Sequence, residues 1–189
     1  MTSVNLKSFN SGDWNSGKNI YILSLYRLMI GAINIFPEDI LFNGTINRLR
    51  VFILRLFGAK IGKGCIINRC FISYPWNLSL GDYSWIGSNV QIYSYVSISI
   101  GSNVCISQQA FITSGGHQIN SDSFNLIVKK ITIKNGVWIG AKSFINPGVT
   151  IEEGVVVSAC AVVTKSLNKY SIYSGIPARY ISPRPLYEN

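Results

Sequence analysis

A bulky aliphatic residue recurs at nearly every sixth position through much of the chain. The rungs of this pattern are Leu80, Ile86, Ile92, Ile100, Ile106, Ile112, Ile133, Ile139, Ile145, Ile151, Val157 and Val163. A small or β-branched residue usually follows four positions later, and Ile61 and Ile67 indicate an earlier coil. A period of six fits neither an α-helix nor the two-residue alternation of a hairpin. It predicts a hexapeptide β-helix, in which short strands form the sides of a prism and three hexapeptides close one coil.

Two longer steps interrupt the period. The step of eight from Ile92 to Ile100 predicts a two-residue insertion at a corner of the prism. The step of twenty-one from Ile112 to Ile133 predicts a loop of about fifteen residues, which can leave a stack of coils only outward. His117, the single histidine of the chain, lies at the start of this loop.

The N-terminal third has a different pattern. Residues 20–36 are apolar and aromatic, but Arg27 and Asn34 interrupt them, so the stretch falls short of the roughly 18–20 apolar residues that span a bilayer. The chain also lacks a basic start followed by a small-residue cleavage site, so we expect no secretory signal.

A second helical pattern runs over residues 48–57 and ends at Gly58. Its apolar face consists of Leu49, Phe52, Ile53 and Leu56, with Arg48 and Arg55 elsewhere on the helix. One interpretation is that both helices cap the open first coil. The other is a peripheral membrane anchor formed by residues 20–57, and the two are compatible.

Composition limits the classes of function. With 189 residues and 48% hydrophobic content, the chain is long enough for one cored domain. The formal charge of +9 is scattered and accompanies no RNA-binding or helix-turn-helix signature, so we expect no nucleic-acid partner. A phosphorylated cofactor, a pyrophosphate-linked substrate or an anionic membrane fits the charge better.

Metal sites are not expected. The four cysteines form no CxxC pair, which favours reduced side chains in a cytoplasmic protein and no zinc site. A β-helical carbonic anhydrase would need three histidines for its zinc, and the chain has one.

Several blocks of sequence resemble the hexapeptide-repeat O-acetyltransferases of colanic acid and related exopolysaccharide pathways. They are 54–62 (LRLFGAKIG), 74–76 (YPW), 80–83 (LGDY), 106–109 (ISQQ), 115–117 (GGH), 146–151 (NPGVTI) and 175–179 (GIPAR). The repeat and the last block are shared with maltose, galactoside and antibiotic acetyltransferases. The LFGAKIG and YPW blocks are more specific.

The resemblance implies a mainly β protein: a left-handed parallel β-helix with an N-terminal helical cap and one extruded loop. The left hand comes from the resemblance alone, because the crossover rule for parallel strands would favour the right hand. It also implies a homotrimer, with acetyl-CoA in the groove between neighbouring prisms. We therefore divide the chain into a helical cap or arm (1–58), the β-helix with its loop at about 115–130 (59–166), and a tail that completes the cofactor groove (167–189).

Transfer of an acetyl group from a thioester to a sugar hydroxyl needs a base near the hydroxyl and hydrogen-bond donors near the developing oxyanion. Imidazole suits the first task because it is mostly neutral at about pH 7. The resemblance assigns this role to His117; the alternative role is a hydrogen bond that stabilises the loop. Asp122 is a candidate to orient the ring, and the oxyanion donor is expected to be a backbone N–H that the sequence does not locate.

The resemblance also implies the cofactor-binding residues Trp138, Ala141, Ala159, Thr164, Lys165 and Arg179. The two basic side chains suit the phosphates of CoA, and the two alanines would let the pantetheine arm approach the coil wall. Arg184 is a further basic candidate. Relatives often have an asparagine near the two-residue insertion, and here Tyr93 or Ser94 would contact the sugar instead.

The expected function is acetyl-CoA-dependent O-acetylation of a surface-polysaccharide precursor, in the cytoplasm or peripherally at the inner membrane face. One alternative is a small acceptor, such as serine, a simple sugar or an antibiotic, which would not require the apolar N-terminal region. The other is a non-catalytic β-helical scaffold, which would need neither His117 nor the basic pair at the last coil.

Overall fold

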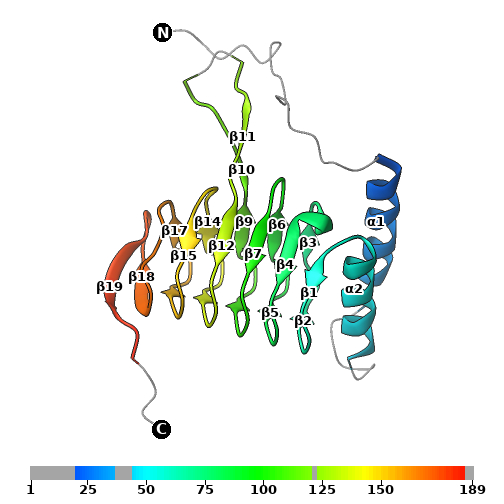
Figure 1. Cartoon of the computed structure of the whole chain (residues 1–189), viewed down its shortest axis with the longest axis horizontal. Coiled ribbons are helices and arrows are strands. Elements are labelled where there is room, and N and C mark those ends of the chain that lie inside the picture. The colour runs from blue at the N-terminus through cyan, green and yellow to red at the C-terminus, as the bar shows by residue number, and fades with distance from the viewer. Residues whose placement is uncertain (1–19, 37–43, 121–122, 186–189) are drawn as a thin grey trace.

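The chain forms a parallel β-solenoid of triangular section with two helices at one end (Figure 1). The computed structural model describes residues 20–36, 44–120 and 123–185. Sheet A contains β1 (Lys60–Ile61), β4 (Leu78–Leu80), β7 (Ile98–Ile100), β12 (Ile131–Ile133) and β15 (Thr150–Ile151). Sheet B contains β2 (Ile66–Ile67), β5 (Trp85–Ile86), β8 (Cys105–Ile106), β13 (Trp138–Ile139), β16 (Val156–Val157), β18 (Ser171–Ser174) and β19 (Arg179–Pro183). Sheet C contains β3 (Phe71–Ile72), β6 (Gln91–Tyr93), β9 (Phe111–Thr113), β14 (Phe144–Ile145) and β17 (Val162–Val163).

The predicted rungs form the core. Every third rung stacks on the same sheet in the next coil in parallel register, as Leu80 pairs with Ile100 and Ile100 with Ile133. All twelve rungs from Leu80 to Val163 are at most 4% exposed, so the six-residue period was interpreted correctly. Ile72 supplies the third rung of the first coil, where the sequence pattern was obscure.

Two helices cover the N-terminal end of the prism, α1 (Ile20–Ile33) and α2 (Thr45–Leu56). Each of the three edge strands has a carbonyl that accepts a hydrogen bond from a helix side chain. Tyr26 Oη donates to Ile72 O at 3.0 Å, Arg50 Nη1 to Ile67 O at 2.7 Å, and Arg55 Nη2 to Ile61 O at 2.8 Å. These bonds satisfy polar groups that an open sheet edge leaves exposed.

The orientation of α2 differs from a simple apolar-inward helix. Leu49, Phe52 and Leu56 are 41%, 60% and 59% exposed, although they belong to the predicted apolar face. The buried face instead includes Arg50, which is 1% exposed. Ile53 of the predicted face is buried, together with Leu54. The physical reason for the difference is that Arg50 bonds Ile67 O and donates from Nε to Asn34 Oδ1 at 3.1 Å, so polar bonds as well as apolar contacts set the inward face.

The C-terminal end is also covered. Leu167 forms a parallel bridge to Ile151 at the last strand of sheet A, and β19 pairs antiparallel with β18 in sheet B. Over sheet C, Val162 N donates to Gly175 O at 3.1 Å and Ala178 N to Val162 O at 2.8 Å.

Candidate active site

The outward excursion is an antiparallel hairpin of β10 (Gly115–His117) and β11 (Leu126–Val128), which projects from the corner between sheets C and A (Figure 1). His117 pairs with Leu126 and is exposed. Its Nδ1 atom lies 3.0 Å from the carbonyl oxygen of Phe124, and the two rings stack with centroids 4.2 Å apart and planes 6° apart. Because a carbonyl only accepts, Nδ1 carries the proton in this contact, and the lone pair of the neutral ring is on Nε2.

The Phe124 carbonyl therefore orients the imidazole, and Asp122 lies outside the described residues. The loop-stabilising bond and the role of base are compatible, since each uses a different ring nitrogen.

The root of the hairpin is packed between two coils. A Cβ on Gly115 would lie 2.6 Å from Cδ2 of Tyr95, so the tyrosine ring fills the space beside that glycine. On the other strand, Lys129 N donates to Ser114 O at 2.8 Å, and the Lys129 side chain passes close to Gly148 of the following coil. The position of His117 thus depends on contacts from the coils on both sides.

The two predicted sugar-contacting residues have different environments. Tyr93 lies in a row of rings on the outside of sheet C, with centroids 5.1 Å from both Phe71 and Phe111. Ser94 is 0% exposed, and its Oγ donates to Tyr74 O at 2.9 Å and accepts from Tyr74 N at 3.2 Å. We therefore assign Ser94 a structural role and keep Tyr93 as the candidate.

Three of the predicted cofactor residues gather around the corner between sheets B and C. Ala141 and Ala159 stand on it in successive coils, where Cys160 N donates to Ala141 O at 2.8 Å. Beside this corner, Trp138 on sheet B is 49% exposed and donates from Nε1 to Ser107 Oγ at 2.9 Å. In the coils before Trp138, a cavity of about 440 Å³ is lined by Asn68, Trp85, Gly87, Ser88, Cys105, Ile106, Ser107 and Gln108.

The other predicted cofactor residues are divided between two corners. Arg179 follows Ala178, whose hydrogen bond to Val162 brings this segment to the corner between sheets B and C. Thr164 and Lys165 are exposed in the turn after β17, at the corner between sheets C and A. Arg184 donates from Nη1 to Gly136 O at 2.8 Å and to Gly154 O at 3.0 Å, which holds the tail on the turns.

The candidate residues of one chain thus lie at the two corners of the prism that border sheet C. The corner between sheets C and A carries the hairpin with His117 and the turn with Lys165. The corner between sheets B and C has Ala141, Ala159 and Arg179, with Trp138 beside it on sheet B.

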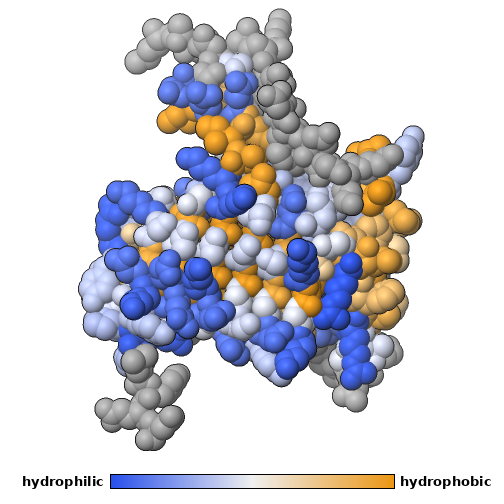
Figure 2. Space-filling model, in the orientation of Figure 1, coloured by the Kyte–Doolittle hydropathy of each residue, from blue (hydrophilic) through white to orange (hydrophobic). Residues whose placement is uncertain are grey.

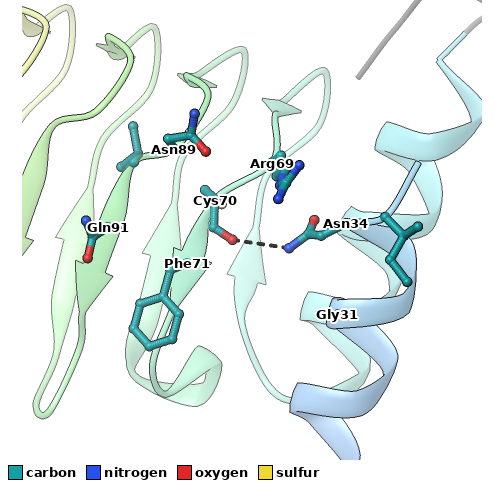
Figure 3. A pocket seen from close by; sticks show the side chains of 9 residues that line it. Gly31, Asn34, Arg69, Cys70, Phe71, Asn89 and Gln91 are labelled. Carbon is teal, nitrogen blue, oxygen red and sulfur yellow. Dashed lines mark hydrogen bonds between the residues drawn. The ribbon is translucent and has the colours of Figure 1, made fainter. Parts of the chain in front are cut away.

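A larger cavity, of about 710 Å³, lies at the N-terminal end of the corner between sheets B and C, where the end of α1 faces the first two coils (Figure 3). Its lining includes Arg69, Asn89 and Gln91, none of which belongs to the predicted site. Within the described ranges, no cluster of three metal-ligating side chains occurs, and no helix is long and apolar enough to cross a membrane.

Three residues with roles near the site were not predicted from the sequence. Phe124 orients the imidazole through a backbone carbonyl, and no sequence signal indicates such a contact. Tyr95 supports the hairpin, and Ser107 binds Trp138 and lines the smaller cavity. Ser107 belongs to the ISQQ block, which could have indicated its importance.

Comparisons with known proteins agree with the fold. Residues 130–165 match the family model described as bacterial transferase hexapeptide (six repeats). The chain is 43% identical to the putative colanic acid biosynthesis acetyltransferase WcaF of Escherichia coli over 138 residues, which cover 72% of this chain and 76% of that protein. It also resembles two solved structures. One is the acetyltransferase VCA0836 of Vibrio cholerae with acetyl coenzyme A, with a TM-score of 0.75, 22% identity and coverage of 95% and 97%. The other is a galactoside acetyltransferase with coenzyme A, with a TM-score of 0.74, 24% identity and coverage of 86% and 80%.

Proposed function

Since the chain belongs to the hexapeptide-repeat acetyltransferases, we propose that it transfers the acetyl group of acetyl-CoA to a sugar hydroxyl of a surface-polysaccharide precursor, with His117 as general base. The observation that carries this proposal is the contact between His117 Nδ1 and the Phe124 carbonyl. It places the basic lone pair on Nε2 of an exposed ring. The similarity to WcaF supports a polysaccharide precursor as the acceptor.

In the proposed reaction, Nε2 of His117 takes the proton of the sugar hydroxyl as its oxygen attacks the thioester carbonyl. The carbon–sulfur bond then breaks, and the CoA thiolate takes the proton back from the imidazolium. The products are an acetyl ester and CoA–SH, and His117 returns to its neutral form. The Phe124 carbonyl would keep Nδ1 protonated throughout, because it can only accept from that nitrogen, so the proton exchange takes place at Nε2.

We propose that CoA lies along the corner between sheets B and C. The cavity beside Trp138 and the lack of bulk at Ala141 and Ala159 support room for a pantetheine arm there. Arg179 at the end of this corner would bind a phosphate of CoA. Thr164 and Lys165 of a neighbouring subunit would reach the same cofactor from the corner between sheets C and A.

This division leads us to propose a homotrimer in which each site is shared. One subunit would supply His117 and Lys165, and the next would supply the corner with Ala159 and Arg179. Cyclic symmetry brings two different surfaces of one chain together at every interface, which suits a site split between two corners. We place the enzyme in the cytoplasm, at the inner face of the membrane.

A thiol-release assay with acetyl-CoA and a panel of candidate glycans tests the proposal. We expect His117→Ala to lower turnover by roughly two to four orders of magnitude, the usual effect of removing a general base. Ile119→Ser is the matched control, because Ile119 lies in the same hairpin and is 89% exposed. Retained turnover in His117→Ala would remove the histidine from the mechanism.

A further inference from the structure

Helix α1 carries apolar side chains on its outer face as well as on its buried face. Leu23 and Tyr26 are buried against the coil, yet Tyr21, Leu25 and Leu28 on the opposite side are 78%, 51% and 71% exposed. Figure 2 shows the resulting apolar patch over α1 at the end of the prism. A soluble helix normally presents polar side chains on its outer face, and a large exposed apolar patch indicates an interaction surface.

The outer stripe of α1 leads into the larger cavity. Gly31 lies three residues after Leu28 on the same face of α1, and Ile35 lies in the turn that follows the helix. Ile35 is 80% exposed and lines the cavity together with Gly31 and Asn34 (Figure 3).

Nothing in the fold requires a glycine at position 31. Its φ lies outside the left-handed region, and a Cβ there would meet no atom within 4 Å. Glycine inside a helix is destabilising, so its presence here has a cost without a packing reason. Its local effect is to leave the mouth of the cavity open.

The cavity itself is polar on the side of the coils. Arg69, Asn89 and Gln91 are exposed and line it, and Asn34 donates from Nδ2 to Cys70 O at 3.4 Å across its floor (Figure 3). A polar cavity that opens beside an apolar stripe suits a ligand with a polar head and a hydrocarbon chain.

The charge of the helical cap is complementary to an anionic surface. Helices α1 and α2 carry Arg27, Arg48, Arg50 and Arg55 and no acidic residue. Arg27, on the same helix as the apolar patch, and Arg48 on α2 are both exposed. Basic side chains around an apolar helix face are typical of helices that lie in the interface of a membrane with anionic lipids.

We propose that the outer face of α1 docks on an anionic phospholipid bilayer and that the cavity at Gly31 holds the headgroup of one lipid. Leu25, Leu28 and Ile35 enter the acyl region, and Arg69 with the neighbouring amides binds the headgroup phosphate. This docking surface does not depend on acetyl transfer. It would bring the enzyme to precursors made at the membrane.

Co-sedimentation with vesicles tests the proposal. The full-length protein should bind vesicles containing phosphatidylglycerol, and bind phosphatidylcholine vesicles more weakly. The double variant Leu28→Ser/Ile35→Ser should weaken binding by about tenfold or more, since each serine removes apolar area that would be buried. Ile181→Ser is the matched control, because Ile181 is 59% exposed at the opposite end of the prism and should leave binding unchanged.

Gly31→Leu tests the cavity separately. A Cβ at this position meets no atom within 4 Å, and leucine favours a helix over glycine, so the variant should fold at least as well as the parent protein. If the cavity holds a headgroup, the added side chain blocks it, and binding to phosphatidylglycerol vesicles falls severalfold. If only the apolar stripe binds, the leucine adds apolar area and binding rises, which would overturn the assignment of the cavity.

Two results would overturn the docking surface as a whole. One is failure of the full-length protein to bind phosphatidylglycerol vesicles, as expected if residues 1–19 or a second copy of the chain cover α1. The other is a double variant that binds vesicles as well as the parent protein. Light scattering distinguishes the second copy, because the double variant would then have a lower mass in solution.

Discussion

At the scale of single residues, the candidate site depends on backbone positions as much as on reactive side chains. The Phe124 carbonyl selects the tautomer of His117, and Gly115 leaves room for the Tyr95 ring at the root of the hairpin. Both contacts fix where the imidazole points without taking part in the chemistry.

Substitution of Gly115 tests this dependence. Gly115→Ala places a methyl group within 2.6 Å of Tyr95, so the hairpin must shift, and a displacement of about 1 Å can reduce turnover by about a hundredfold. We expect kcat to fall in Gly115→Ala and to recover partly in Gly115→Ala/Tyr95→Leu. Gly116→Ala is the matched control, because its nearest neighbour, Pro147 Cγ, lies at an ordinary 3.8 Å. Equal activity of the two alanine variants would show that the ring does not position the hairpin.

Ser94 provides a test of its structural role. Ser94→Ala leaves the backbone groups of Tyr74 without the partners that the hydroxyl supplied, so we expect a loss of about 1–3 kcal/mol in the free energy of unfolding. The KM for the glycan should stay unchanged. A raised KM with unaltered stability would return Ser94 to the sugar site.

At the scale of elements, the helical cap and the hairpin are the parts that the six-residue period does not describe. The period identified every rung from Leu80 to Val163, because an inward aliphatic side chain is needed at each of these positions whatever the surroundings. The orientation of α2 was not predictable in this way. Arg50 is buried with bonds to the Ile67 carbonyl and the Asn34 side chain, which lie 17 and 16 residues away in sequence, and the apolar pattern of the helix does not indicate these partners.

The site could be predicted only in part for the same reason. His117 and the alanines of the corner belong to recognisable blocks, whereas the partner of His117 is a main-chain oxygen. A contact made by a main-chain oxygen does not restrict which residue type occupies the position, so the sequence does not indicate it. The hand of the coil is also absent from the spacing, because a six-residue repeat fits either hand.

The cap should also determine stability at high pH. Burial raises the pKa of Tyr26, as does the nearby Cys70 thiol, so the unfolded chain loses the tyrosine proton first as the pH rises above about 10. The free energy of unfolding contributed by protonated Tyr26 is complete below that pH, and it is lost at about 1.4 kcal/mol per pH unit above it. Tyr74 and Tyr95, whose pKa values are also raised mainly by burial, act in the same direction.

Tyr26→Phe should therefore lower the free energy of unfolding by about 1 kcal/mol at neutral pH, because Ile72 O loses its donor. The substitution should also make the free energy of unfolding decline less steeply as the pH rises above about 10. Denaturant unfolding at several pH values measures both effects. Tyr21→Phe, on the exposed side of the same helix, controls for loss of a hydroxyl, and an unchanged slope in Tyr26→Phe would contradict the assignment.

At the scale of the whole molecule, the candidate residues lie at the two corners that border sheet C. A single prism therefore does not bring the proposed base and the proposed CoA corner together. Assembly of several chains is the simplest way to join them.

Complementation between inactive variants tests this arrangement. His117→Ala removes the base, and Ala159→Trp would block the corner while leaving the hairpin intact. When the two inactive proteins are coexpressed or refolded together, shared sites should restore roughly a quarter of the parental activity, because chance pairing joins an intact hairpin to an intact corner at that frequency. A mixture that stays inactive although mixed oligomers form would place the whole site within one subunit.

The covered ends of the prism have a consequence for its growth. Parallel coils are stackable without limit, and two open ends would let one molecule continue the sheets of the next into a fibre. Here Arg50, Arg55 and Tyr26 bond one carbonyl of each edge strand at one end, and at the other end Leu167, the antiparallel strand β19 and residues 175–178 lie on the last parallel strands. The chain is in this respect a solenoid of fixed length, and concentrated solutions should remain clear of filaments.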